Sequence, residues 1–319
     1  MARTVILAHG DADGVTAAAV AKSVYKSAEV FFTHPVGLLG DFREFAREAS
    51  RVLILDISLD ERHLEDLLEE FRRFRGEILY IDHHPLPPGA RLEEVGVEVV
   101  HEEGPCAAEL TFRRLKPGWD MSRVALYGAI GDYALNTPWV KEAMLRWDIK
   151  SLFLEAGALV LGLDYIGRDH ELKRRIVDEL SRDVLPTSIP ELLIAAVVQA
   201  RRIEEMRRRL PQLVKSRGSV AYVINPPGSL GLAAFYARVV TGKPVGLAAS
   251  ERGGTYVISI RACDPRIDLN SLLRRLAPRL GGHGGGHPQA AGARIPAARL
   301  AEFIEELDEA VSAACSGKR

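Results

Sequence analysis

The chain has 319 residues, of which 47% are hydrophobic and 27% are charged, and its formal net charge is −1. This composition is typical of a globular protein and excludes disordered, collagen-like and disulfide-knot chains. The near-neutral charge also argues against a protein that coats long duplexes. No apolar run approaches the ~20 residues of a membrane span, and the N-terminus is apolar too briefly for a signal peptide. We therefore expect a cytoplasmic protein with no membrane partner.

Residue usage adds two narrower points. Three widely spaced cysteines form no CxxC pair, which excludes a zinc knuckle. Arginine makes up 33 of the 42 basic residues, and only six residues are Asn or Gln. Scarce amides with many ion-pairing side chains are typical of a thermophilic protein, although a GC-rich genome would also favour arginine.

Strand and helix patterns alternate over residues 1–165, which predicts βαβ units and a mostly parallel sheet. The predicted strands are 5–8, 30–33, 52–56 and 78–82, and the helical patterns between them include 14–26 and 60–74. Helical periodicity then dominates residues 107–210, whose charged stretches 169–182 and 204–209 are read mostly as solvated helix faces.

A smaller α/β domain is predicted from residue 216 to residue 319, after a helical connector over residues 166–215. Its predicted strands are 220–224, 245–249 and 256–260, and its predicted helices are 230–240, 269–280 and 297–313. The predicted fold class is therefore α/β, with an N-terminal parallel-sheet domain and a smaller C-terminal α/β domain joined by helices.

The first chemical signal follows the first predicted strand, where His9, Asp11 and Asp13 occupy alternate positions. In extended backbone a period of two points the three side chains the same way, as half of a metal site requires. The simplest alternative is that one carboxylate caps the helix beginning near Gly14. Capping accounts for one carboxylate, but not for two together with a histidine.

Two further apolar strands end in the same kinds of residue. The strand 52–56 ends on Asp56, and the strand 78–82 ends on Asp82 and is followed by His83 and His84. The carboxyl ends of parallel strands meet at one edge of a sheet, where open α/β folds bind ligands. Clustered carboxylates repel one another, and divalent metals are the usual way to neutralise them. The pattern therefore favours a metal site.

These residues resemble a known family, the DHH phosphoesterases. Motifs I to IV of that family are matched by His9-Gly10-Asp11-Ala12-Asp13-Gly14, by Asp56, by Asp82-His83-His84 and by Gly131-Asp132. The glycine-rich segment Gly281–Gly292 resembles the GGGH signature of the DHH-associated C-terminal domain. All five signatures occur in the expected order, so the resemblance covers nearly the whole chain.

The resemblance implies a centre of two Mn²⁺ ions, for which Mg²⁺ or Co²⁺ are substitutes. One metal would take His9, Asp11 and Asp56, and the other would take Asp13, Asp56, His83 and Asp132. His84 would contact the substrate phosphate and protonate the leaving oxygen, and Asp82 would orient a histidine or the surroundings of the nucleophile. Without the resemblance, Asp132 reads equally well as a capping residue at a helix end.

The C-terminal signature is predicted to bind phosphate or a terminal nucleotide, because a glycine-rich loop lets backbone N–H groups approach an anion. The predicted binding residues are Arg261, His283, Gly284, Gly285, Gly286 and His287. A flexible turn or a metal-binding histidine pair are the alternatives for the loop, and a surface position is the alternative for Arg261. We expect the remaining histidines to be structural or at the surface. We expect Tyr133 and Phe235 to be packed in the core, and stacking on nucleic-acid bases is the alternative for both.

The function predicted from the resemblance is hydrolysis of phosphodiester bonds in short single-stranded oligonucleotides, by a water that two metals activate. The layout is similar to the nano-RNases and small archaeal RecJ-like 3′–5′ exonucleases. The partner would be short single-stranded RNA or DNA or a nucleotide. A cyclic-dinucleotide phosphodiesterase and a 3′-phosphoadenosine 5′-phosphate phosphatase are alternatives. Pyrophosphatases of this family are disfavoured, because their second domain lacks the GGGH signature.

A hypothesis from another class is a nucleic-acid repair accessory that binds a helicase or replisome partner through the charged helical region 169–209. A homodimer is also expected, since dimers are common.

Overall fold

The computed structural model describes residues 3–316. It divides into two compact units, the first ending at Gln199 and the second beginning at Ala200. The predicted connector 166–215 is therefore shared between the units rather than standing apart. Helix α9 (Pro190–Arg209) contains the boundary. In the described part of the chain, no helix combines the length and apolar character that crossing a membrane requires.

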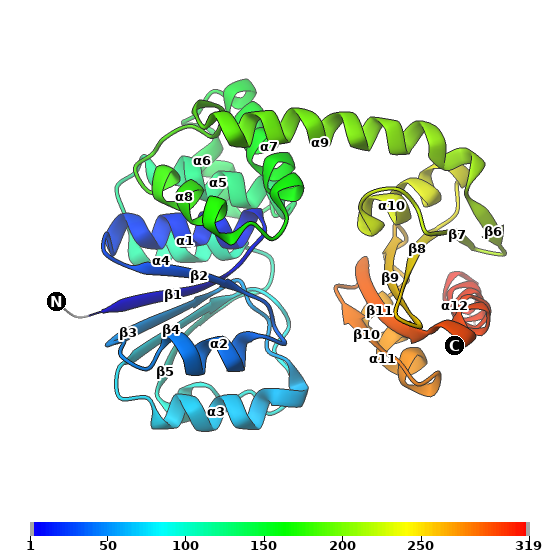
Figure 1. The fold of residues 1–319 in the computed structure, drawn as a ribbon, viewed down its shortest axis with the longest axis horizontal. Coiled ribbons are helices and arrows are strands. Elements are labelled where there is room, and N and C mark those ends of the chain that lie inside the picture. Colours follow the sequence, from blue (N-terminus) through cyan, green and yellow to red (C-terminus); the bar gives the residue numbers. More distant parts are fainter. Residues whose placement is uncertain (1–2, 317–319) are drawn as a thin grey trace. The chain divides into compact units, whose positions relative to one another are not determined.

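The first unit is built on a parallel sheet of five strands in the order β2-β1-β3-β4-β5 (Figure 1). The strands are β1 (Thr4–His9), β2 (Glu29–Thr33), β3 (Arg51–Leu55), β4 (Glu77–Asp82) and β5 (Val97–His101). Helices cover both faces, so the central strands are apolar without alternation. In β3, for example, Val52, Leu53, Ile54 and Leu55 are all fully buried.

Two helical layers enclose this sheet (Figure 1). One face packs against α2 (Leu38–Phe45) and α3 (Leu64–Arg73), and the other packs against α1 (Ala12–Val24), α4 (Ala107–Leu115) and α5 (Met121–Gly131). The outer helices of the unit are α6 (Pro138–Met144), α7 (Ile149–Ile166) and α8 (His170–Leu180). Small residues on α1, such as the buried run Ala17–Ala21, allow the neighbouring helices to approach closely.

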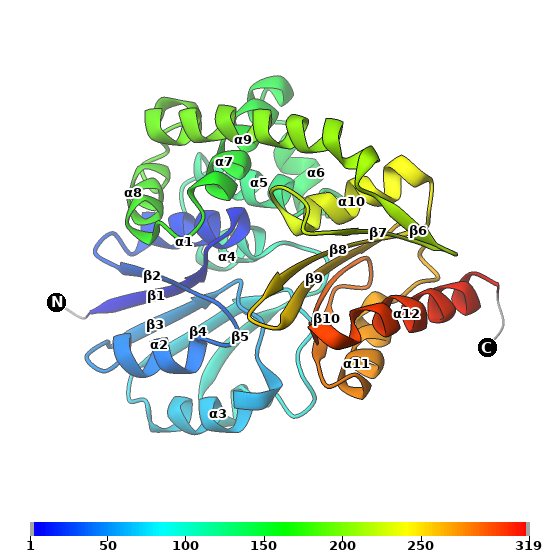
Figure 2. The same ribbon diagram turned by 45° about the vertical axis from the view of Figure 1, so that its right-hand side comes forward.

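The second unit contains a mixed sheet of six strands in the order β10-β11-β9-β8-β7-β6 (Figure 2). The strands are β6 (Lys215–Arg217), β7 (Val220–Ile224), β8 (Val245–Arg252), β9 (Thr255–Ala262), β10 (His283–Gly286) and β11 (Ala290–Pro296). Helix α10 (Leu230–Thr241) covers one face, whereas α11 (Leu269–Arg279) and α12 (Leu300–Cys315) cover the other.

The predicted fold class is confirmed: both units are α/β and the first has the parallel sheet. The segment 281–292 was expected to be a glycine-rich loop, but residues 283–286 form β10 and pair with β11, so the alternative of a flexible turn is excluded for these residues. Its glycines serve close packing: a Cβ on Gly284 would lie 3.1 Å from the Leu273 side chain, and one on Gly282 would lie 2.1 Å from the Arg294 carbonyl oxygen.

Candidate metal centre

The candidate site lies at the carboxyl ends of three adjacent strands of the first unit, β1, β3 and β4. His9 ends β1, Asp56 follows β3, and Asp82 ends β4. The strand order reverses between β1 and β3, because the chain passes from β1 to its outer neighbour β2 and then back to β3. Ligands of open α/β sheets bind in the crevice that forms at this kind of switch point.

The turn from β1 into α1 fixes the first three candidate residues. Gly14 is required there, since a Cβ on it would lie 2.3 Å from the carbonyl oxygen of His9. The Gly14 N–H donates to Asp11 Oδ1 at 3.1 Å, so Asp11 does cap α1. Its second oxygen, Oδ2, lies 2.9 Å from His9 Nδ1. Asp11 therefore caps α1 with one oxygen and contacts the cluster with the other.

Asp13 turns away from its own helix and stabilises the start of another. Its two carboxylate oxygens accept hydrogen bonds from the backbone N–H groups of Ala107 (2.7 Å) and Ala108 (2.8 Å) at the N-terminus of α4. Close approach of α5 completes this arrangement, because a Cβ on Gly128 would lie 2.9 Å from Asp13 Oδ1. Asp13 is 3% exposed.

Seven of the predicted residues form three overlapping groups whose candidate ligand atoms lie within 4.8 Å of one another. The groups are His9, Asp11 and Asp56; Asp13, His83 and Asp132; and Asp56, His83 and His84. His83 connects them, since its Nε2 lies 3.5 Å from Asp56 Oδ1 and its Nδ1 lies 3.7 Å from Asp132 Oδ2. The tertiary structure thus brings all six predicted metal ligands together.

Asp82 lies outside these groups and serves His84 instead. Its Oδ1 is 2.9 Å from His84 Nδ1, and its Oδ2 accepts from the hydroxyl of Tyr80 at 2.8 Å. Both Asp82 and Tyr80 are fully buried. His101, which sequence reasoning treats as structural, also contacts this region, with Nε2 2.6 Å from the carbonyl oxygen of His84.

The cluster fits divalent cations on its own chemistry. Asp56 is 3% exposed, and its Oδ2 has no hydrogen-bond partner, the nearest imidazole nitrogen of His9 being 3.7 Å away. Its backbone is held at φ 59°, an αL conformation that Asp tolerates better than most residues. A buried carboxylate beside other carboxylates is unfavourable unless a cation compensates it. This donor set of carboxylates and imidazoles suits Mn²⁺, Mg²⁺ or Co²⁺.

The electrostatics of the cluster agree with that fit. Burial, together with repulsion from Asp11 and Asp13, raises the pKa of Asp56 well above its usual range. Burial and the charge of Asp13 raise the pKa of Asp132 to about 6. Burial opposes the charged form of His9, but the carboxylates of Asp11 and Asp56 outweigh this and raise its pKa to about 10. Without a cation, the cluster therefore holds protons that metal ligation would displace.

We expect Mn²⁺ binding at pH 7 to release protons, since His9 with a pKa of about 10 must lose its proton before the ring nitrogen can ligate. The affinity for Mn²⁺ should fall as the pH is lowered, most steeply below the pKa of about 6 of Asp132, because protons and metal compete for the same atoms. Titration calorimetry in two buffers with different ionisation enthalpies measures this proton release. Equal heats in both buffers, or a pH-independent affinity, would contradict it.

Only some of the substrate-binding residues predicted in the second unit lie in the same part of its sheet. Arg261 is the penultimate residue of β9 and pairs with Ala290. Mutual backbone hydrogen bonds between His287 and Ala290 close the hairpin turn at 287–290. The Arg261 guanidinium lies against the start of α10, where a Cβ on Gly231 would be 2.7 Å from it. His283 is exposed at the opposite end of β10 from Gly286 and does not join this group.

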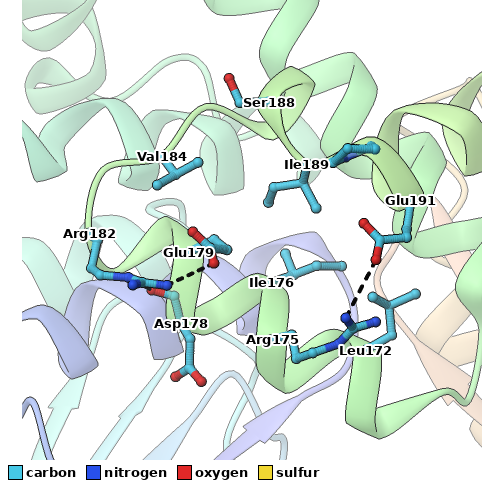
Figure 3. Close-up of a pocket in the computed structure, with 11 residues that line it drawn as sticks. Leu172, Arg175, Ile176, Asp178, Glu179, Arg182, Val184, Ser188, Ile189 and Glu191 are labelled. Carbon is cyan, nitrogen blue, oxygen red and sulfur yellow. Dashed lines mark hydrogen bonds and ion pairs between the residues drawn. The ribbon is translucent and has the colours of Figure 1, made fainter.

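Two hollows of the first unit differ in character. One, of about 400 Å³, lies between α8 and the start of α9, and ion pairs such as Arg175–Glu191 (3.5 Å) and Arg182–Glu179 (2.8 Å) occupy its lining (Figure 3). The other, of about 740 Å³, is lined by Tyr133, which follows Asp132 in the chain, and by Asn136 and Trp139 among others. Tyr133 is 88% exposed, so its predicted core packing is wrong.

Sequence reasoning missed Lys173, which is 5% exposed and donates from Nζ to the carbonyl oxygen of Gly10. It also missed the role of Tyr80. Lys173 stands inside a strongly charged helical stretch, and nothing in that pattern singles it out. Only the packing of α8 against α1 reveals that one of these charges is buried.

Comparison with known proteins gives a family match for the second unit. The DHHA1 domain model matches residues 218–313. No curated protein sequence matches the chain significantly.

Solved structures match over nearly the whole chain. RecJ from Thermus thermophilus, solved in complex with Mn²⁺, is 20% identical with a TM-score of 0.69, covering 97% of this chain and 52% of that one. A DHH domain from a member of a family of ribosomal proteins is 15% identical with a TM-score of 0.70, covering 97% and 86%. A pGpG-specific phosphodiesterase from Vibrio cholerae is 13% identical with a TM-score of 0.60, covering 98% and 99%. These matches establish the fold, and the chain spans about half of the Thermus RecJ.

Proposed function

We propose that this chain, which has the fold of the DHH-family phosphoesterases and carries a DHHA1 domain, hydrolyses phosphodiester bonds of short single-stranded oligonucleotides. The observation that carries the proposal is the cluster of six carboxylate and imidazole ligands at the switch point of the parallel sheet. The similar proteins named above include RecJ and a pGpG phosphodiesterase, which supports a substrate with phosphodiester bonds.

The proposed ligand sets follow the contact groups. His9, Asp11 and Asp56 would hold one cation, and Asp13, His83, Asp132 and the shared Asp56 would hold the other. Bound divalent ions would lower the pKa of a water and stabilise the negative charge that develops on the phosphate oxygens. The contribution of the protein is to fix the ligands, and the hydrogen bonds from α4 to Asp13 do so for the second set.

His84 is the proposed proton donor to the leaving oxygen. Asp82 engages its Nδ1, and the Tyr80 hydroxyl in turn holds the other oxygen of Asp82. This chain of contacts fixes the orientation of the ring. The proton delivered in this proposal is the one on Nε2, because Nδ1 is committed to Asp82.

Within the second unit, we propose that Arg261 and His287 bind the phosphate or terminal nucleotide of the substrate. Arg261 is the penultimate residue of β9 and lies against the start of α10, and His287 lies in the turn of the β10–β11 hairpin, just before Ala290, the partner of Arg261. A guanidinium beside a helix N-terminus is a chemically suitable environment for an anion. Gly284 and Gly285 allow the hairpin to lie close to α11. A Cβ on Gly286 would instead meet Ala291 of β11, and the Gly286 N–H donates to Asn270 Oδ1 at 3.2 Å. His283 is left out of this proposal.

The substrate class is tested with a ladder of 5′-labelled RNA and DNA, from dinucleotides to ~20-mers, in the presence of Mn²⁺. A cyclic dinucleotide, 3′-phosphoadenosine 5′-phosphate and pyrophosphate are assayed beside it. We expect the shortest oligomers to disappear first. If only a non-polymeric compound is hydrolysed, the proposed substrate class is wrong. Hydrolysis that persists in EDTA would contradict the metal mechanism.

The groove beside Asp132 is a candidate place for the base of the scissile nucleotide. Tyr133 presents an exposed ring there, with its backbone held at φ 57°, which is unusual for a bulky residue. If a base stacks on this ring, Tyr133→Ala should raise KM for a dinucleotide by roughly 5- to 150-fold, from a stacking energy of about 1–3 kcal/mol.

Steady-state kinetics on Tyr133→Phe and Leu145→Ala provide the comparison. The Phe variant keeps the ring and should retain the wild-type KM. Leu145 is 86% exposed in the same unit but outside the groove, so its truncation should have no effect. An unchanged KM in Tyr133→Ala would contradict the proposal that a base binds in this groove.

A further inference from the structure

Lys173 is a buried ammonium that the proposed chemistry does not use. It lies on α8, and its side chain is 5% exposed, whereas most charges of that helix face solvent. Burial lowers its pKa, partly offset by the nearby charges of Asp11 and Asp164. Burying a lysine is unfavourable, so a specific contact is needed to explain why this charged side chain is buried.

The contact made by Lys173 is specific. Its Nζ donates to the backbone carbonyl of Gly10, the residue between His9 and Asp11. A Cβ on Gly10 would lie 3.2 Å from Nζ, so the glycine leaves room for the ammonium. The hydrogen bond therefore acts on the peptide that joins two of the proposed ligands to one cation.

Helix α8 gives Lys173 a rigid base. Ile176 and Val177 are fully buried in the core that α8 shares with α1. Lys22 on α1 pairs with Asp178 on α8 at 2.8 Å, and Asp169 caps α8 by accepting from the Leu172 N–H at 3.0 Å. The position of the ammonium is thus set by packing on α1, independently of the loop that it contacts.

We propose that Lys173 is a positioning residue for the metal centre: by holding the Gly10 carbonyl, it fixes the turn that presents His9 and Asp11 to one cation. This inference rests on the proposed metal site. A role through charge and a role through position predict opposite changes in cation affinity when Lys173 is removed. If Lys173 acted only through its positive charge, removing it would strengthen cation binding. If it acts through position, removing it weakens binding.

The test is calorimetric titration of Mn²⁺ into the full chain. Lys173→Met removes the charge and the donor, whereas Lys173→Gln removes the charge and keeps an N–H donor. We expect Lys173→Met to bind one Mn²⁺ at least roughly tenfold more weakly, the effect typical of a group that orients a ligand. Lys173→Gln should fall closer to the wild type. Arg175→Met, which removes an exposed charge of α8 that pairs with Glu191 rather than with α1, should leave Mn²⁺ affinity unchanged.

Other outcomes are equally informative. Wild-type affinity or tighter binding in Lys173→Met overturns the positioning role. Failure of the wild-type chain to bind Mn²⁺ overturns the metal centre itself. If Lys173→Met does not fold, as judged by its circular dichroism, Gly10→Ala takes its place, because the added methyl would lie 3.2 Å from Nζ and make the ammonium shift while keeping its charge. Unchanged Mn²⁺ affinity in Gly10→Ala would then overturn the inference.

Discussion

Asp56→Asn should lower the rate of phosphodiester hydrolysis by about a thousandfold or more while making the metal-free protein more stable. In the proposed centre Asp56 would be a ligand of both cations, and a neutral amide is a much weaker ligand for divalent ions than a carboxylate. A loss of ~4 kcal/mol of transition-state stabilisation corresponds to that factor. Asparagine tolerates the αL backbone of residue 56, so the fold should be retained.

The stability gain follows from the unfavourable position of the carboxylate. Asp56 is buried, its Oδ2 has no hydrogen-bond partner, and repulsion from Asp11 and Asp13 adds to burial in raising its pKa. A neutral amide should therefore raise the free energy of unfolding in EDTA by about 0.5–2 kcal/mol, the usual exchange between stability and activity. The measurements are kcat/KM on a dinucleotide and chemical denaturation in EDTA.

Asp60→Asn is the matched control. Asp60 lies four residues further along the chain and pairs with Arg62 at the surface, away from the cluster. This variant should keep full activity. Retained activity in Asp56→Asn, with nuclease contamination excluded, would contradict the assignment of the metal centre.

Asp13→Ala should be the most destabilising of the single changes at the site. It leaves the buried N–H groups of Ala107 and Ala108 without their acceptor at the start of α4. Each unsatisfied group costs about 1–3 kcal/mol, so a loss of roughly 2–5 kcal/mol is expected, with relief of carboxylate repulsion offsetting part of it. Denaturation of the metal-free protein measures this effect separately from metal binding.

Asp11→Ala provides the comparison for Asp13. Asp11 is also a proposed ligand, but its structural contact is a partly exposed cap of α1, worth about 1 kcal/mol. Both variants should lose one metal, whereas only Asp13→Ala should lose much stability. Equal destabilisation by the two variants would mean that the hydrogen bonds from α4 to Asp13 stabilise the fold no more than the cap that Asp11 provides.

Much of the first unit was predictable because its strands are buried on both faces. Continuous apolar runs such as 52–55 indicate central parallel strands, and in the second unit β7 was predicted with the bounds that the structure has. The helix α2 and the strand β5 were missed: α2 has only eight residues and includes Gly40, and β5 carries Glu98 and His101 beside its valines. In β10, glycine is selected by the close approach of α11, a contact that no local pattern reveals.

The candidate site was predictable for a related reason. Its six proposed ligands each stand at a strand or helix end next to an apolar run, so position in the sequence and position in space are closely linked. Asp82 could be placed beside the cluster in the same way, but its contact with His84 and support from Tyr80 could not. Tyr133 has an exposed ring and an αL backbone. Neither property could be predicted from the sequence, because the residues next to Tyr133 are not glycine or proline.

Apolar periodicity and strand-end carboxylates are local properties of the chain, so they were enough to predict the fold class and a metal site at the strand ends. Asp132 was added to that site only by the family resemblance. Which of these groups also support the fold became clear only from the packed helices. Asp13 holds the start of α4, and Lys173 holds the Gly10 peptide from a helix 163 residues further along the chain. Such contacts depend on how helices pack, and packing joins residues whose separation in sequence carries no signal.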